Sequence, residues 1–374
     1  MDKCNIGVVT FPMYKSGNQP LSNLIDIIVL WSEKTTLVTG NDGYTLFKTD
    51  PRLNVSGTDH VSGVFLISRI IKYLCTQVKI SYLMIQRTPD VDKWIFFFGG
   101  NGLLLPLLIA KLSGKQTALL LPDAGAGLAK ASNDPLTYFL KVLSHITYTL
   151  ANNLILYSPR LIKEWNLEKY HHKILITHRH FLDFSTFTVV APLTNRSPII
   201  GYIGRLSGEK GIQNFVQALP AILSVRQDLR VFIGGDGELR EIIETFLQEE
   251  GIATRVDLLG WIPHNDLPDY LNQLRLLILP SYTEGLPNIM LEAMACGTPV
   301  LATPVGAIPD VIIDGKTGFI MENNSPECIA KNVTRALNSP DLERIAEDGR
   351  RFVEENFTFE RTVENWKEVL QNIE

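Results

Sequence analysis

The fold of this chain is decided by the stretch LLILPSYTEGLPNIMLEAMACG, residues 276–297. Residues 276–279 are continuously apolar, as a buried parallel strand requires. Pro287 suits the first turn of a helix and Gly297 suits its end, so we expect a helix over about 287–296. A strand, a loop and a helix in this order form the repeating unit of an α/β fold, with the loop at the carboxyl edge of a parallel sheet.

The same alternation extends from this unit to both ends of the chain. In the second half we expect further strands at 199–203, 230–234, 256–259 and 299–302. In the first half we expect strands at 6–10, 37–39, 82–86, 94–98, 117–121 and 154–158, and helices from about 21, over 61–78 and over 135–151. Strands that alternate with helices predict parallel sheets covered on both faces, so the expected fold is α/β with two doubly wound, Rossmann-like domains.

The length of 374 residues is more than one ordinary core accommodates, which favours two domains. A segment with two prolines and little periodicity, residues 188–198, is interpreted as the linker. We therefore expect a first domain over 1–190, a second over 195–345 and a final helical segment over 346–374. Ligands of such sheets bind outside the carboxyl ends of the strands, so the expected site is a cleft between the two domains.

The charge is distributed unevenly along a chain of otherwise ordinary soluble composition. Over residues 1–194, 19 Lys and Arg face 13 Asp and Glu, whereas residues 195–374 carry 16 and 27. A basic first half fits an anionic partner, either a phosphorylated acceptor or an anionic membrane surface, and equally a solvated surface with no partner. We expect no nucleic-acid partner.

The cysteines and the start of the chain indicate the cellular compartment expected for the protein. The four cysteines match no disulfide or metal-ligand spacing, which favours reduced thiols in a reducing compartment. The start MDKC has no basic flank before a long apolar run, so we expect no signal peptide. Residues 94–110 are the most apolar region, but glycines and Pro106 interrupt them, and we expect a strand, a glycine turn and a buried helix. The expected location is cytoplasmic, with peripheral contact to the inner face of the membrane as an option.

Two glutamates in the opening stretch are candidates for chemistry. Glu284 precedes the expected helix, and Glu292 lies one turn after Asn288 on the same face. The amino end of a helix attracts phosphate, and carboxylates accept hydrogen bonds from pairs of sugar hydroxyls. The alternative is an exposed acidic helix on which Glu292 is merely solvated.

Two cations flank a second glycine loop, within IIGYIGRLSGEKG at residues 199–211. Arg205 and Lys210 lie between an expected strand and an expected helix. Cations on a flexible backbone can hold a pyrophosphate, particularly where no metal does so. The alternative is an ordinary turn with exposed basic residues.

Together these motifs resemble glycosyltransferase family 4, the glycogen-synthase-like group of transferases. The resemblance is carried by GRLSGEKG (204–211), GGDG (234–237), GW (260–261), EGLPNIMLEAMACGTPV (284–300) and GAIPDVIIDGKTG (306–318). It is dense over 195–345 and thin before that. It implies the GT-B fold, whose last helix returns to the first domain, and a retaining transferase that needs no divalent metal and no other cofactor.

The resemblance also implies roles for individual residues. Arg205 and Lys210 would hold the donor diphosphate, with Glu284 at the donor sugar and Glu292 at the nucleotide ribose. The base would lie at Trp261 and Ile262. The remaining donor-binding positions are Gly17, Gly204, Gly285, Leu286, Pro287, Asn288 and Ile289.

The first half departs from the family pattern. Its first loop, Ser16-Gly17-Asn18, has one glycine where the family has two, and Asp123 stands where many members carry a histidine. Asp123 would act at the sugar or only shape a turn. The D-x-D triplet at 90–92 precedes a strand, so we interpret it as a solvated turn rather than a metal motif. We interpret the HRH triplet at 178–180 as a polar loop rather than a metal site.

The predicted function is retaining transfer of a hexose or N-acetylhexosamine from a nucleoside-diphosphate sugar to a glycan or a lipid-linked acceptor. No covalent nucleophile is evident, so the departing phosphate is the candidate base for the acceptor hydroxyl. A nucleotide-sugar epimerase, which has no acceptor, and a non-catalytic nucleotide-sugar-binding subunit are the alternatives. Donor base, sugar and acceptor are not identified by the sequence.

Overall fold

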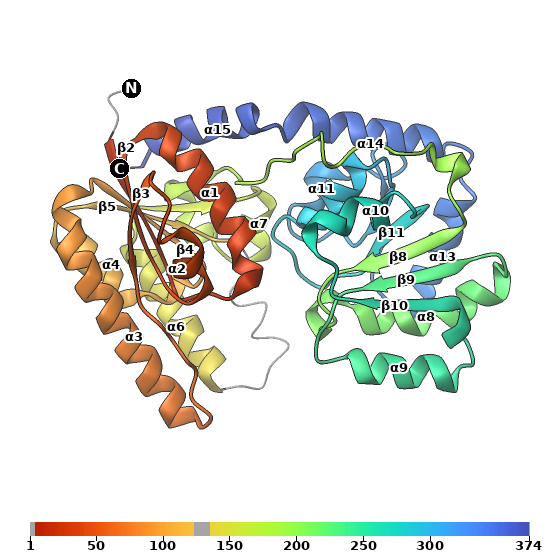
Figure 1. Ribbon diagram of the computed structural model, residues 1–374, viewed down its shortest axis with the longest axis horizontal. Helices are drawn as coiled ribbons and strands as arrows, with labels where there is room; N and C mark the ends of the chain where they lie inside the picture. Colours follow the sequence, from red (N-terminus) through yellow and green to blue (C-terminus); the bar gives the residue numbers. More distant parts are fainter. Residues whose placement is uncertain (1–3, 123–134, 374) are drawn as a thin grey trace. The chain divides into compact units, whose positions relative to one another are not determined.

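A computed structural model describes residues 4–122 and 135–373 of the chain (Figure 1). These residues form two compact units. Unit 1 comprises residues 4–181 and 360–373, and unit 2 comprises residues 182–359. The segment expected to be a linker, 188–198, therefore belongs to unit 2. Of the final segment 346–374, the described residues from 360 onward belong to unit 1.

Unit 1 is built on a seven-stranded parallel sheet. Its strand order is β3-β2-β1-β4-β5-β6-β7. The chain adds β2 and β3 on one side of β1 and the later strands on the other, so the switch point of this doubly wound sheet lies between β1 and β4. The apolar central strands are buried on both faces, which a parallel sheet covered by helices requires. The strands are β1 (Cys4–Thr10), β2 (Ser32–Thr39), β3 (Leu53–Gly57), β4 (Lys93–Phe97), β5 (Gln116–Leu120), β6 (Asn153–Leu156) and β7 (Ile174–Ile176).

Helices connect these strands and cover the sheet of unit 1 (Figure 1). They are α1 (Asn18–Trp31), α2 (Asp42–Phe47), α3 (Leu66–Arg87), α4 (Leu104–Leu112), α6 (Pro135–Leu150) and α7 (Arg160–Glu164). The last helix of the chain, α15 (Phe359–Gln371), also packs here, and the indole of Trp366 donates a hydrogen bond of 2.9 Å to the carbonyl of His178. Short 3-10 helices include η1 (Lys15–Gly17), η2 (Thr88–Asp90), η3 (Gly100–Gly102) and η4 (Glu168–Lys173).

Unit 2 repeats this architecture with six parallel strands in the order β10-β9-β8-β11-β12-β13. Here the switch point, where the chain begins to add strands on the other side of β8, lies between β8 and β11, which pair through Ile200 and Leu276. The strands are β8 (Ile199–Ile203), β9 (Arg230–Gly234), β10 (Val256–Gly260), β11 (Leu276–Leu279), β12 (Val300–Ala302) and β13 (Phe319–Ile320). The helices are α8 (Ile212–Val225), α9 (Arg240–Glu249), α10 (Leu267–Leu271), α11 (Asn288–Ala295), α12 (Ile308–Val311), α13 (Pro326–Leu337) and α14 (Leu342–Asn356).

The prediction of two doubly wound parallel sheets is confirmed, with three differences in detail. The expected strand at 82–86 is wrong, because these residues continue α3. Strands β3, β7 and β13 were not expected. The expected last helix is two helices, α14 and α15, separated at Phe357 and Thr358.

Residues 94–110 have the structure expected of them. They form most of β4, the glycine-rich η3 and most of α4. Within the described parts of the chain, we find no helix whose length and apolar character would let it span a bilayer.

Candidate functional site

The two motifs of the second half meet at the switch point of the sheet in unit 2. Gly204 and Arg205 directly follow β8, and the loop that carries Glu284 follows β11. Because β8 and β11 are neighbours in the sheet, their carboxyl ends lie side by side. Ligands of open α/β sheets bind at such a position.

Lys210 and Glu284 form an ion pair across this switch point. The Nζ of Lys210 donates hydrogen bonds to Oε1 of Glu284 at 2.8 Å and to Oε2 at 2.9 Å. The hydroxyl of Ser281 donates a further bond of 2.8 Å to Oε1. The Glu284 side chain is only 9% exposed, whereas the Lys210 side chain is 25% exposed. The carboxylate is thus fixed from two sides, and the ammonium group keeps one side open to solvent.

Arg205 is not brought into this pair. Its side chain is 63% exposed, and its Nη1 lies 3.3 Å from Oε1 of Glu209. Its backbone is held more firmly, because the buried hydroxyl of Tyr202 donates a 2.6 Å hydrogen bond to the Arg205 carbonyl. Among the described residues, no hydrogen bond or ion pair joins Arg205 to Glu284 or Glu292. The sequence placed Arg205 and Lys210 on one loop, and the structure pairs only Lys210 with Glu284.

Glycines let the loops around this pair touch backbone to backbone. Gly211 has φ +67°, and a Cβ there would lie 2.0 Å from the carbonyl oxygen of Pro280 at the end of β11. Gly306 has φ +61°, and a Cβ there would lie 2.2 Å from the carbonyl oxygen of Glu284. Any other residue at these two positions would separate the loops.

Helix α11 begins at Asn288, with Pro287 as its N-cap in extended conformation. Among the described residues, no side chain caps this end, and its first turn contains no acidic residue. The first amide groups of such a helix are donors without intrahelical partners. These amide groups follow Glu284 by only a few residues. An anion bound to them would therefore be held only a few residues along the chain from the Lys210–Glu284 ion pair.

Glu292 is buried inside α11, at 5% exposure, so the alternative of a solvated acidic helix is wrong for this residue. Its Oε1 lies 3.0 Å from Nε2 of His264, in the 3-10 helix η8 (His264–Asp266). The hydrogen bond to Glu292 raises the pKa of His264 above its ordinary value, against the opposing effect of burial. The ring of His264 also meets Phe187 edge-on, at 5.5 Å between centroids.

The partners Ser281 and His264 were missed by sequence reasoning. Ser281 lies within the quoted stretch, three residues before Glu284, a spacing at which a serine side chain can reach a carboxylate. His264 lies two residues after Ile262 in sequence and carries no local signal. Only the packing of η8 against α11 identifies it.

Trp261 and Ile262 follow β10 at the same edge of the sheet but differ in environment. Ile262 is buried, at 8% exposure, and its Cδ1 would lie 2.5 Å from a Cβ at Gly234. Trp261 is 71% exposed. An indole in this position is a surface on which a planar group can stack.

The candidate residues of the first half lie in unit 1. Gly17 is buried at the end of η1, where a Cβ would lie 2.1 Å from the terminal methyl of Met13, so packing alone explains the glycine. Asp123 lies outside the described residues. Residues 178–180 lie in a loop, as expected, and Arg179 and His180 are buried in it.

The environment of the D-x-D triplet at 90–92 is explained without a metal ion. Asp92 accepts a 2.8 Å hydrogen bond from the amide of Asn5, and Asp90 is exposed in η2. Within residues 4–122 and 135–373, no three His, Cys, Asp or Glu side chains are grouped so that they could hold a metal ion.

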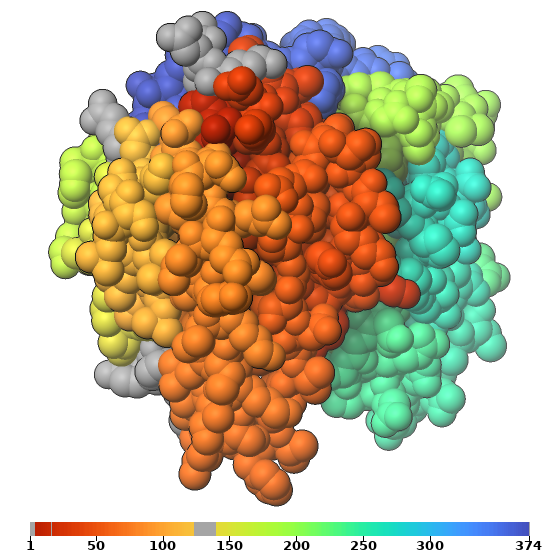
Figure 2. Space-filling model, turned by 60° about the vertical axis from the view of Figure 1, so that its left-hand side comes forward, coloured from red at the N-terminus to blue at the C-terminus, as the bar shows by residue number. Residues whose placement is uncertain are grey.

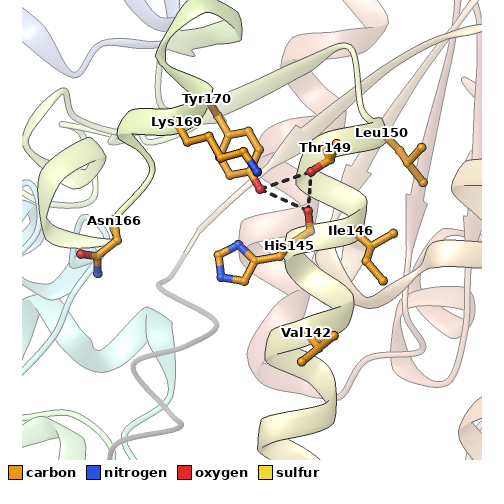
Figure 3. Close-up of a pocket in the computed structure, with 8 residues that line it drawn as sticks. All are labelled: Val142, His145, Ile146, Thr149, Leu150, Asn166, Lys169 and Tyr170. Atoms are coloured by element: carbon orange, nitrogen blue, oxygen red, sulfur yellow. Dashed lines mark hydrogen bonds between the residues drawn. The ribbon is translucent and has the colours of Figure 1, made fainter.

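A hollow of about 550 Å³ lies elsewhere, in unit 1 between α6 and η4 (Figure 3). Figure 3 shows Tyr170 beside the last turns of α6, where its hydroxyl donates a 3.2 Å hydrogen bond to the carbonyl of His145. None of the predicted site residues that the structure describes lines it. The lining residues are Val142, His145, Ile146, Thr149, Leu150, Asn166, Lys169 and Tyr170.

Comparison with known families agrees with the position of these motifs. Residues 186–352 match the family model of the glycosyl transferases group 1. The α-D-kanosaminyltransferase of Streptomyces kanamyceticus is 30% identical over 187 residues, which are 48% of this chain and 48% of that protein. The Vi polysaccharide biosynthesis protein VipC/TviE of Salmonella typhi is 26% identical over 349 residues, 87% of this chain and 57% of that protein. The chain thus spans only about half the length of the curated relatives it matches.

Solved structures share the whole fold. The Anabaena protein HepE, solved in complex with UDP and glucose, superposes with a TM-score of 0.77 at 16% identity. The superposition covers 98% of this chain and 99% of HepE. The GT-B prediction for the fold is therefore confirmed.

Proposed function

We propose that this chain is a retaining glycosyltransferase that takes a hexose or an N-acetylhexosamine from a nucleoside-diphosphate sugar bound to unit 2. The acceptor in this proposal is a glycan or a lipid-linked acceptor. The observation that carries the proposal is the Lys210–Glu284 ion pair at the switch point, a few residues before the uncapped start of α11. The match of residues 186–352 to group 1 glycosyl transferases supports it.

The diphosphate is assigned to Lys210, Arg205 and the start of α11. An ammonium group has three N–H donors, and Glu284 engages it at two close contacts, which leaves donor capacity for a phosphate oxygen. Arg205 is exposed and can swing from Glu209 to the ligand, since a bidentate guanidinium–phosphate contact is stronger than a long surface pair. We assign no divalent metal and no other cofactor to the site.

The donor sugar and nucleoside are assigned to the remaining residues. Glu284 would accept a hydrogen bond from a sugar hydroxyl, and Glu292, oriented by His264, would accept from the ribose. The nucleobase is assigned to the exposed indole of Trp261 and to Ile262. Gly17 as a donor-binding position and Asp123 at the sugar are expectations from the sequence, and they are part of this proposal only.

The reaction proposed here keeps the configuration of the anomeric carbon. The bond from that carbon to the β-phosphate oxygen breaks, and its electron pair stays on the phosphate. The acceptor oxygen forms its bond on the same face, and its proton passes to the departing phosphate. Lys210 and the amides of α11 would stabilise the negative charge that grows on this phosphate.

The test is a thermal-shift screen of the whole chain with UDP-, GDP- and ADP-sugars, followed by calorimetry of any hit. UDP-glucose is the first donor to try, because HepE was solved with UDP and glucose. A ligand that binds only the folded state raises the melting temperature by mass action. No shift with any donor at millimolar concentration would contradict the proposal.

A second arm separates a transferase from an epimerase. The chain is incubated with the bound donor alone, and the free nucleotide sugars are separated by chromatography. A transferase leaves the donor intact or slowly hydrolyses it to free nucleotide. A new nucleotide-sugar isomer would replace the proposal with an isomerase. The anomeric configuration of any glycoside formed, read by NMR, tests retention.

A further inference from the structure

Helix α3 exposes an apolar stripe, which we call the α3 outer face. It consists of Ile67, Ile71, Leu74, Val78, Tyr82 and Ile85, each between 43% and 73% exposed. Spacings of three and four residues align these side chains along one side of the helix. The loop before α3 continues this apolar surface with Val64 and Phe65, at 89% and 77% exposure. Figure 2 shows α3, in orange, open on the face of unit 1 that is turned forward.

Helix α3 is apolar on its outer side although its buried side is partly polar. The buried side contains the apolar Ile80 and Met84, both fully buried, and also the polar residues Thr76, Gln77 and Ser81, at 3%, 2% and 8% exposure. Gln77 accepts a 3.0 Å hydrogen bond from the amide of Leu105 at the start of α4, so the inner side of α3 is bonded to unit 1. A surface helix normally turns its apolar stripe to the core and its polar side to water. The exposed apolar stripe of α3 is therefore available to another apolar surface.

The charge around the stripe has one sign. Between Asp59 and Asp90 the sequence contains no acidic residue, but it contains Arg69, Lys72, Lys79 and Arg87. Lys72 and Lys79 are exposed on α3 beside the apolar stripe. Long basic side chains that flank exposed apolar and aromatic residues are the pattern of a helix lying at an anionic lipid interface.

We propose that the α3 outer face docks unit 1 onto the surface of an anionic lipid bilayer. The helix lies in the interface, with Ile71, Val78 and Tyr82 among the acyl boundary and the two lysines at the headgroup phosphates. A second copy of the chain fits less well, because pairing two such faces would bring like charges together without an acidic partner on either helix. Within the proposed function, docking on a bilayer favours the lipid-linked acceptor over the glycan. Lipid binding itself does not depend on sugar transfer.

The most apolar region of the sequence, residues 94–110, does not supply this surface with its strand. Trp94 to Phe97 of β4 are fully buried in the sheet. On α3, basic and apolar side chains reach the surface together. The sequence concealed this because residues 82–86 read as a strand.

The test measures binding of the whole chain to vesicles without any sugar donor. Co-sedimentation with vesicles of neutral phosphatidylcholine is compared with vesicles that also contain phosphatidylglycerol, at low and at high salt. We expect binding to the anionic vesicles, weakened by salt. Ile71→Glu should reduce the partition coefficient at least about tenfold, because it replaces an inserted apolar group by an anion.

The matched control is Ile242→Glu in α9 of unit 2. Ile242 is 56% exposed and Ile71 is 54% exposed, so the two variants change surface charge and hydrophobicity alike. Lys72→Gln with Lys79→Gln should weaken binding to anionic vesicles at low salt and lessen its salt dependence. Lys72 and Lys79 are both exposed, so the circular dichroism spectrum and the melting temperature of this double variant should stay near those of the parent chain.

Three results would overturn the proposal. The first is absence of binding to anionic vesicles at low salt. The second is equal loss of binding in Ile71→Glu and Ile242→Glu. The third is a dimer in sedimentation velocity that only Ile71→Glu dissociates, which would assign the face to a second copy. None of these affects donor binding by unit 2, so this proposal and the proposed function can fail separately.

Discussion

At the scale of single residues, the site depends on how each charged group is compensated. Lys210 and Glu284 neutralise one another across two loops, and Ser281 holds the carboxylate in place. Glu292 is buried and has His264 as its hydrogen-bonding partner. A buried carboxylate without such a partner would cost several kcal/mol in desolvation. These pairings orient the acidic groups before any ligand arrives.

Lys210→Ala should weaken binding of the nucleoside-diphosphate sugar by about 1.5–3 kcal/mol, the value of a hydrogen bond to a charged group. Isothermal titration calorimetry measures the change. Lys316→Ala is the control, because Lys316 is an exposed lysine of the same unit. Unchanged affinity in Lys210→Ala, with an unchanged melting temperature, would remove Lys210 from the donor site.

His264→Gln should flatten the pH dependence of stability. The pKa of His264 is raised in the folded state, so its stabilising contribution is complete below the unfolded pKa of about 6.5. That contribution is lost as pH rises through the folded pKa. The ring is half-exposed, so we expect less than about 1 kcal/mol. Urea unfolding of both proteins at acidic and alkaline pH measures it, and His172→Gln, an exposed histidine, should behave like the parent.

At the scale of elements, strand ends and glycine loops bring the site together. The loop after β8 carries Lys210, the loop after β11 carries Glu284, and Gly211 allows the two backbones to meet. Local sequence predicted most of these elements because buried strands are apolar runs and loops contain glycine. It failed at 82–86, since a short apolar run fits a strand and a helix equally well.

Gly211→Ala should lower the free energy of unfolding by more than Gly251→Ala does. Both glycines have φ +67°, and a left-handed backbone costs any other residue about 1–2 kcal/mol. A Cβ at Gly211 also meets the Pro280 carbonyl at 2.0 Å, whereas nothing lies within 4 Å of one at Gly251. Urea denaturation compares them. Equal losses would mean that the loop relaxes away from β11.

At the scale of the whole molecule, the chain returns to its first unit at its end. Trp366 of α15 is fully buried in unit 1, and Lys93 of β4 donates hydrogen bonds to the carbonyls of Leu370 and Ile373. Unit 1 is therefore completed only when the last helix is made. This closes a loop of nearly the whole chain, and the cost of such closure grows only slowly with loop length.

Trp366→Ala should cost about 3–5 kcal/mol of stability, as for other fully buried tryptophans. Trp261→Ala should change stability by no more than about 0.5 kcal/mol, because that indole is 71% exposed. Urea unfolding followed by far-ultraviolet circular dichroism measures both. A small loss in Trp366→Ala would show that α15 contributes little to unit 1. Donor affinity should decline in Trp261→Ala if the indole stacks on the base.

By itself the sequence determined the class of fold and the stretches that matter. Apolar runs, glycines and prolines act on their immediate neighbours, so the alternation of strands and helices and the two motifs could be identified locally. Only the tertiary structure decided which of the charged residues meet. Lys210 reaches Glu284 because β8 and β11 are neighbours in the sheet, and Glu292 reaches His264 because η8 packs against α11. The outward apolar face of α3 likewise follows from which side of the helix the sheet and α4 cover, and no local pattern contains that information.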